Sequence, residues 1–271
     1  ANAPFSIELD LGFTDNPILT PNMKLERGEA PAKARIGWMR SVSNIFHAFA
    51  VQSFINEAAH KAGKDAKDYL LEVIGPDRII DVTEQNAEYM NYWGDKAVYP
   101  LDTSRLKNVI KKVASMANWG REMPKGRGLG IAAHRSFLTY VATVVEVEIS
   151  DKGDLTIVKS WVAIDAGTVV NTDTVINQTQ GGSIFGITTA ISDGITFDKG
   201  RVQQSNFHNY RVPRMSDAPL DIEVEVVQSD AAPAGVGEPA TPVYAPALCN
   251  AIFAACGKRI RQLPIGNQLK A

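Results

Sequence analysis

Apolar side chains recur every three or four positions in three stretches of the first half of the chain, the spacing typical of a helix that buries one face. The pattern predicts helices within residues 41–63, 64–77 and 102–120. The glycines expected to end them are Gly63, Gly75 and Gly120. Residues 1–35 lack this period and contain several prolines, so we expect an extended, irregular N-terminal segment.

In the second half the apolar period falls to two, which is typical of strands. Residues 138–150 and 155–167 alternate in this way around the turn DKGD and predict a long antiparallel hairpin. A helical period then returns in residues 172–192 and again in 245–257. Between these two helices we expect a short hairpin in residues 194–205 and a strand in residues 221–230. Helices followed by strands mixed with helices indicate an α+β fold.

Composition and charge exclude several classes of protein. The 271 residues are 45% hydrophobic and 21% charged, as in an ordinary globular domain. Their 28 basic and 30 acidic residues are well mixed, with a formal charge of −2, so no nucleic-acid partner is expected. Cys249 and Cys256 are interpreted as two small apolar residues of a buried helix. ANAPFSIELD (residues 1–10) has neither an initiator Met nor the pattern of a signal peptide, so the chain is expected to be processed or part of something longer.

Two features that could carry chemistry give weak signals. The glycine-rich basic stretch PKGRGLG, residues 124–130, is not a Walker loop and is interpreted as a flexible loop. The four histidines, at His47, His60, His134 and His208, do not cluster in the sequence as zinc ligands do.

Glycines in the helix of residues 172–192 need a reason, because each costs roughly 1 kcal/mol relative to alanine. NQTQGG and the glycine that follows it supply three within six residues: Gly181, Gly182 and Gly186. Close packing of this helix against a sheet is one explanation. Close approach of a ligand, with Gln178 or Gln180 offering its amide, is the other. The residues alone favour neither.

GVGEP, residues 235–239, poses a similar question just ahead of the last helix. Glu238 is either a helix-capping carboxylate that favours the helix dipole or a side chain that carries chemistry. The flanking glycines, Gly235 and Gly237, would let the backbone take unusual dihedral angles and let another molecule come close. Two glycine-polar elements in one domain favour the chemical role.

These elements stand in an order that resembles a known family. VAIDAGTVVNTDTVINQTQGGSIFG, GRVQQSNFHNYRVPRMSDAP and GVGEPATPVYAPALCNAIFAACGKRIRQLPI resemble the C-terminal part of the molybdenum-binding subunit of the xanthine oxidase family. The branch it resembles is the isoquinoline 1-oxidoreductase beta-subunit type, which includes bacterial aldehyde dehydrogenases. GWMRSVSNIFHAFAVQSFINEAAHKAGKD resembles the same branch, so the likeness covers most of residues 36–267. It implies that residues 36–271 form a C-terminal molybdopterin-binding domain with mixed sheets and packed helices.

The resemblance also implies a cofactor and a mechanism. The cofactor is molybdopterin carrying Mo, commonly in its cytosine dinucleotide form, and no side chain of this chain is expected to bind the metal directly. Glu238 would be the general base that deprotonates a Mo-bound hydroxyl, whose oxygen attacks an aldehyde or an N-heterocycle, while a hydride passes to a sulfido ligand. Arg40, in WMRS where relatives of the xanthine oxidase type have FRGF, corresponds to an arginine near the substrate pocket; a structural arginine at a helix start is the alternative. The positions implied to bind the cofactor are Gln178, Gly181, Gly182, Gly235, Val236 and Gly237.

One departure from the family concerns the rest of the site. A further glycine-glutamine-glycine element normally encloses the cofactor, and these 271 residues contain none. We therefore expect the chain to be half of a cofactor-binding subunit that is completed by a second chain. The resemblance further implies a partner subunit with [2Fe-2S] clusters and, in some members, a cytochrome c subunit. It allows either the periplasmic side of the bacterial inner membrane or the cytoplasm. The alternative function is a non-catalytic scaffold or assembly subunit that kept the fold.

Overall fold

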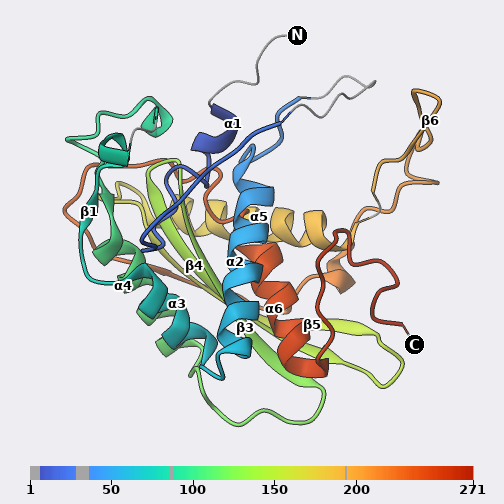
Figure 1. The fold of residues 1–271 in the computed structure, drawn as a ribbon. Helices are drawn as coiled ribbons and strands as arrows, with labels where there is room; N and C mark the ends of the chain where they lie inside the picture. Colours follow the sequence, from blue (N-terminus) through green and yellow to red (C-terminus); the bar gives the residue numbers. More distant parts are fainter. Residues whose placement is uncertain (1–6, 29–36, 86–87, 193, 271) are drawn as a thin grey trace.

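The structure, a computed structural model, describes residues 7–85, 88–192 and 194–270 apart from 29–36 (Figure 1). Within this part of the chain the central element is a sheet of four strands in the order β3-β4-β5-β8. Their bounds are Arg127–Ser136 for β3, Thr139–Ile149 for β4, Leu155–Asp165 for β5 and Ile222–Val226 for β8. The first three are antiparallel and β8 pairs parallel to β5, so the expected α+β class is confirmed.

The long hairpin of the sequence analysis is β4 and β5. Tyr140 pairs with Asp165 at one end and Ile149 with Leu155 at the other, which leaves DKGD as the turn. The expected strand in residues 221–230 is β8, and the expected short hairpin is β6 (Phe197–Asp198) with β7 (Arg201–Val202). This hairpin lies on an arm that extends away from the sheet (Figure 1).

Helices cover both faces of the sheet. One face packs against α4 (Thr103–Met116), which in turn contacts α3 (Ala66–Ile74). The other packs against α6 (Tyr244–Cys256), which also contacts α5 (Thr172–Ile191). One further long helix, α2 (Asn44–Lys61), lies beside α6 and α3 (Figure 1). Successive strand residues point to opposite faces of the sheet. Ile131 and Ala133 therefore belong to the hydrophobic core on the α4 side, and Ala132 belongs to the core on the α6 side.

PKGRGLG is not the flexible loop that we predicted, because β3 begins at Arg127 inside it. A Cβ on Gly130 would lie 2.1 Å from the main-chain nitrogen of Ala251, and one on Gly128 would lie 2.5 Å from that of Ala255. These glycines therefore let α6 pack directly on β3. Residues 127–130 are thus part of a strand with a packing role, and only residues 124–126 are a loop.

Smaller elements complete the fold. The N-terminal segment is not extended throughout, since residues Ile7–Asp10 form the short helix α1. Two short strands, β1 (Ile79–Ile80) and β2 (Leu101–Asp102), pair with each other. Single 3-10 turns occupy Val82–Gln85, Asn91–Trp93 and Met215–Asp217.

The two cysteines of α6 differ in environment. Cys249 is buried, as expected, but Cys256 at the end of the helix is exposed, so the interpretation of two buried residues was wrong for Cys256. Among the helices of the described residues, none combines the length and the apolar character that crossing a membrane requires.

Candidate functional site

Glu238 lies at a pocket formed by segments that are far apart in the sequence. The pocket has a volume of about 360 Å³. Its lining is mostly apolar and aromatic and consists of Leu11, Trp38, Met39, Arg40, Val42, Tyr92, Trp93, Phe137 and Glu238. The sequence analysis predicted Glu238 and Arg40 and missed the aromatic walls, because the connection that carries Tyr92 and Trp93 has no regular period.

The Glu238 carboxylate is held by the turn that precedes α2. The main-chain N–H of Ser41 donates to Oε1 of Glu238 at 2.7 Å, and the Ser41 hydroxyl donates to the Glu238 carbonyl oxygen at 2.7 Å. Among the described residues no donor reaches Oε2, so this oxygen is available for a proton. The capping alternative was wrong, because α6 begins at Tyr244 and its N-cap, Val243, has no side-chain cap.

Arg40 ties the two glycine-polar elements together. Its Nε donates to the carbonyl oxygen of Gly237 at 2.7 Å. Its second terminal nitrogen donates to Oε1 of Gln178 at 3.1 Å and to the Gln178 carbonyl oxygen at 3.3 Å. Partial burial lowers the pKa of Arg40, while the nearby charge of Glu238 raises it. One guanidinium thus fixes the distance between α5 and the GVGEP segment.

Close packing explains two of the three α5 glycines, although their partners are α6 and the turn before it and not the sheet. The ligand explanation stays a prediction, and Gly181 is the position that it fits. A Cβ on Gly186 would lie 2.5 Å from Cβ of Tyr244, and one on Gly182 would lie 3.0 Å from Cβ of Ala240. These two glycines allow α5 to pack on α6 and on the turn before it. Gly181 faces outward instead, where the nearest atom to an added Cβ is a nitrogen of Arg40 at 4.0 Å.

The glutamines of α5 divide in the same way. Gln180 donates through Nε2 to the carbonyl oxygen of Ile222 at 3.0 Å, so its amide connects α5 to β8. Gln178 is exposed, and its Nε2 has no acceptor within the part of the chain that the structure describes. The amide nitrogen of Gln178 therefore has both N–H groups available for a ligand, whereas that of Gln180 already uses one for β8.

The GVGEP glycines do not take the unusual dihedral angles that we expected, since neither Gly235 nor Gly237 has a positive φ. A Cβ on Gly235 would lie 3.2 Å from Cβ of Phe137, which makes Gly235 a packing residue. Nothing lies within 4 Å of a Cβ on Gly237, so open space meets the chain there. The side chain of Val236 is partly buried and packs on a core cluster that includes Val243.

The pocket walls carry left-handed backbone at residues other than glycine. Positive φ angles occur at Ser41, Val42, Tyr92, Trp93 and Phe137, four of which line the pocket. Each such residue costs roughly 1–3 kcal/mol and persists where surrounding contacts enforce it. Strain of this kind concentrates at functional sites, so its location supports a function for this pocket.

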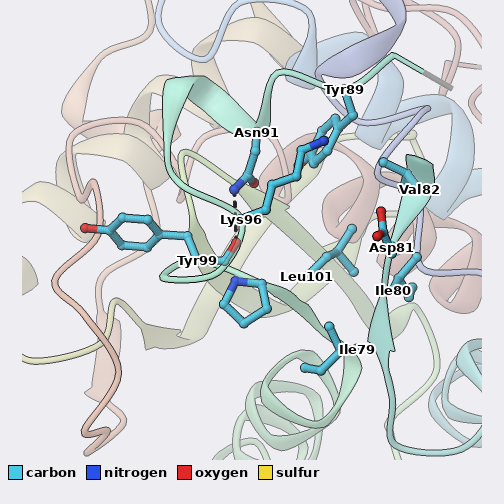
Figure 2. Close-up of a pocket in the computed structure, with 10 residues that line it drawn as sticks. Ile79, Ile80, Asp81, Val82, Tyr89, Asn91, Lys96, Tyr99 and Leu101 are labelled. Carbon is cyan, nitrogen blue, oxygen red and sulfur yellow. Dashed lines mark hydrogen bonds between the residues drawn. The ribbon is translucent and has the colours of Figure 1, made fainter. Parts of the chain in front are cut away.

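A second, smaller hollow lies behind the 91–93 turn (Figure 2). It has a volume of about 110 Å³ and is lined in part by Asn91 and Tyr99. The Asn91 side chain donates to the Tyr99 carbonyl oxygen at 3.0 Å, as Figure 2 shows, and accepts from Arg135 at 2.8 Å. These bonds fix the turn that supplies Tyr92 and Trp93 to the larger pocket.

Two of the histidines, which are far apart in the sequence, lie together in the fold. A Cβ on Gly12 would be 3.0 Å both from Cε1 of His134 and from Cβ of His47, and His134 belongs to β3. Burial lowers the pKa of His134 to about 3 and also lowers the pKa of His47, so both rings are neutral at pH 7. Over the described residues no three His, Cys, Asp or Glu side chains gather as a metal site would require.

Comparison with known proteins assigns the family. The family model described as a molybdopterin cofactor-binding domain matches residues 48–219. The membrane-bound aldehyde dehydrogenase [pyrroloquinoline-quinone] of Gluconacetobacter polyoxogenes is 29% identical over 85% of this chain and 29% of its own length. The beta chain of isoquinoline 1-oxidoreductase from Brevundimonas diminuta is 36% identical over 61% of this chain and 22% of its own length. A nicotinate dehydrogenase subunit of Pseudomonas putida is 27% identical over 90% of this chain and 20% of its own length.

A solved structure shares the fold at lower sequence similarity. The aldehyde oxidoreductase of Desulfovibrio gigas superposes with a TM-score of 0.63 at 12% identity, over 84% of this chain and 40% of that one. The chain thus spans less than a third of the length of each of the three sequence relatives named above. The family that the motifs predicted is confirmed: the chain belongs to the molybdopterin cofactor-binding domain family, the family of the molybdenum-binding subunits of xanthine oxidase type.

Proposed function

We propose that this chain is the cofactor- and substrate-binding part of a molybdenum-dependent oxidoreductase that oxidises an aldehyde or an N-heterocycle with water as the oxygen source. Glu238 is its general base. The observation that carries the proposal is the position of Glu238, which lines the pocket and whose Oε1 is held by the Ser41 N–H at 2.7 Å, while Oε2 has no donor among the described residues. The relatives named for aldehyde, isoquinoline and nicotinate oxidation support this substrate range.

The residues around Glu238 fit a bound pterin cofactor. The space beside Gly181 and Gly237 is open, since an added Cβ would lie 4.0 Å from the nearest atom at Gly181 and would meet no atom within 4 Å at Gly237. Arg40 holds together the segments that carry these two glycines. Gln178 presents an amide N–H beside Gly181, a donor suited to the polar atoms of a pterin ring. The cofactor would be held by Gln178 and by the main chain at Gly181 and Gly235–Gly237, in its cytosine dinucleotide form. Gly182 contributes by packing, not by contact.

The cofactor supplies the two-electron oxidation of the substrate carbon when it is bound. The chain supplies position and one proton acceptor. Oε2 of Glu238 takes the proton from the water-derived oxygen as that oxygen attacks the substrate, and the Ser41 N–H keeps the carboxylate in one orientation. Aromatic walls at Tyr92 and Phe137 bind a planar or apolar substrate and exclude bulk water.

Completing the enzyme requires other polypeptide. Each of the three sequence relatives aligned above is more than three times as long as the part that this chain matches, and two of them are named as subunits. We propose that a second chain or part of the molybdenum subunit closes the cofactor site. Electrons leave through a [2Fe-2S] subunit, with a cytochrome c subunit as a further partner. Stoichiometric molybdenum in this chain purified alone would contradict the need for a second chain.

The test replaces Glu238 with glutamine in the assembled protein. The Glu238→Gln variant keeps the size of the side chain and removes its basicity, so turnover of benzaldehyde, isoquinoline or nicotinate should fall by about 10²–10⁴-fold. Molybdenum content should stay at the wild-type level. The matched control is Glu225→Gln, since Glu225 lies on β8 and pairs with Lys112 at 3.2 Å, away from the pocket.

Two results would overturn the proposal. Wild-type turnover by Glu238→Gln would remove Glu238 from the mechanism. Purified active protein that contains pyrroloquinoline quinone and lacks molybdenum would overturn the cofactor, and this outcome matters because one relative carries that quinone in its name. Metal analysis together with quinone extraction distinguishes the two cofactors.

A further inference from the structure

Asn44, the first residue of α2, is completely buried beside the pocket and uses both ends of its amide. Its Nδ2 donates to the Ser41 carbonyl oxygen at 3.1 Å. Its Oδ1 accepts from the Tyr92 hydroxyl at 3.0 Å and lies 2.8 Å from Nε2 of His134. One amide therefore contacts the turn before α2, the 91–93 turn and strand β3.

The first of these contacts concerns Glu238. Ser41 has φ 77° and Val42 has φ 51°, values that L residues rarely adopt, so the turn needs outside support. The Ser41 carbonyl oxygen receives both the Asn44 side chain and the Asn44 main-chain N–H, each at 3.1 Å. The N–H of the same Ser41 residue donates to Oε1 of Glu238. The turn that Asn44 supports is thus the turn that orients the carboxylate.

The other two contacts concern the pocket walls. His134 is neutral because burial lowers its pKa to about 3, so its Nε2 carries the proton and donates to Oδ1 of Asn44. Tyr92 has φ 54°, and its ring lies against the ring of Phe137 with centroids 5.0 Å apart. Both rings line the pocket. Holding the Tyr92 hydroxyl therefore holds two walls in place.

We infer that Asn44 is a positioning residue that couples the orientation of Glu238 to the shape of the pocket. Its two acceptor contacts require an oxygen and its contact to Ser41 requires a donor, so an amide is the side chain that satisfies all three. Removing it leaves Tyr92 and His134 without an acceptor and releases the strained turn at Ser41. The catalytic role of Glu238 in this inference rests on the proposed function. The coupling of the turns does not.

The test compares Asn44→Ala with Asn250→Ala in the assembled protein. Asn250 is the matched control, because it is 2% exposed and its Nδ2 donates to the Ile131 carbonyl oxygen at 3.1 Å, in α6 and away from the pocket. Hydrogen exchange followed by mass spectrometry should be about tenfold faster or more in peptides spanning residues 39–43 and 90–94 of Asn44→Ala. The same peptides of Asn250→Ala should exchange as in the wild type.

Turnover gives a second measurement. With the substrate that the wild type oxidises, Asn44→Ala should lose about tenfold to 100-fold in kcat with less change in KM, as expected when a base is misaligned. If Asn44→Ala does not fold, Asn44→Asp takes its place, because it keeps the acceptor oxygen for Tyr92 and His134 but removes the donor to the Ser41 carbonyl oxygen, and the same acceleration of exchange is expected in residues 39–43. Unchanged exchange in residues 39–43, or equal acceleration in the Asn250 control, would overturn the inference. Loss of activity in Glu238→Gln but not in Asn44→Ala would leave the proposed function standing and refute the positioning role.

Discussion

Arg40 joins segments that are 138 and 197 residues away in the sequence. The motifs predicted Arg40, Gln178 and Glu238 one by one, because each stands in a recognisable local pattern. They could not predict that Arg40 links Gln178 to Gly237, since no local pattern reports a contact over such separations. The support of Glu238 by Ser41 and Asn44 was missed for the same reason. At the residue scale, the sequence therefore indicates the chemical groups, and the fold decides what orients them.

We predict that Arg40→Lys weakens cofactor retention while the fold is kept. A lysine ammonium keeps the charge but cannot reproduce the fork that reaches Gly237 and Gln178 together. The molybdenum content of the purified complex should fall, with little change in melting temperature. Arg261→Lys is the control, because Arg261 makes a comparable paired contact with Glu57 on the surface. Full molybdenum content and wild-type turnover in Arg40→Lys would contradict a bridging role.

Most elements of regular structure follow from the sequence pattern. The predicted helices in residues 41–63, 64–77 and 102–120 correspond to α2, α3 and α4, and the predicted hairpin corresponds to β4 and β5. The misses share one cause. The pattern predicts a loop in residues 124–130 because glycine disfavours strands locally, whereas contact with α6 selects glycine there. The left-handed turn at Tyr92 is likewise enforced by tertiary contacts such as those of Asn44 and Asn91.

Helix α5 offers a test that separates packing from ligand contact. Gly186→Ala should destabilise the protein by about 1–3 kcal/mol, because the new Cβ would meet Cβ of Tyr244. Gly181→Ala has open space and should stabilise the cofactor-free chain by up to about 1 kcal/mol through helix propensity. Urea unfolding measures both changes.

The same pair of variants also tests the position of the cofactor. If a pterin approaches α5 at Gly181, Gly181→Ala should lower the molybdenum content of the complex although it stabilises the helix. Equal molybdenum content in wild type and Gly181→Ala would place the cofactor elsewhere. A stable Gly186→Ala variant would show that α5 and α6 can separate without cost.

On the scale of the whole molecule, a buried ionic group joins the N-terminal segment to the sheet. Asp15 accepts from the Gly12 N–H at 2.8 Å and from the Tyr89 hydroxyl at 3.0 Å, and it lies 3.7 Å from a guanidinium nitrogen of Arg135 in β3. The Asp15 and Arg135 side chains are 1% and 2% exposed. The division into an N-terminal segment of residues 1–35 and a separate domain stays a prediction. These contacts make the described part around Asp15 integral to the core beside the pocket.

The burial of Asp15 has a consequence for stability that depends on pH. Burial raises its pKa from 3.8 to about 6, against the opposing charge of Arg135. A carboxyl whose pKa is higher in the folded protein than in the unfolded chain contributes its full stabilisation at pH values below its unfolded-state pKa. That contribution is lost as the pH rises through its folded-state pKa. From pH 4 to pH 7 the free energy of unfolding of the wild type minus that of Asp15→Asn should therefore decrease by about 2 kcal/mol.

Urea unfolding of both proteins at several pH values measures this difference. The contributions of groups that titrate identically in the two proteins cancel in the subtraction. Asp154→Asn is the control, because contact with Lys270 lowers the pKa of exposed Asp154, so its contribution changes below about pH 4 and the corresponding difference should stay nearly constant from pH 4 to pH 7. A wild-type minus Asp15→Asn difference that stays constant from pH 4 to pH 7 would show that Asp15 titrates normally. The N-terminal segment would then not be sealed against the sheet in solution, and Leu11, which follows Asp10 on this segment, would not form a fixed wall of the pocket.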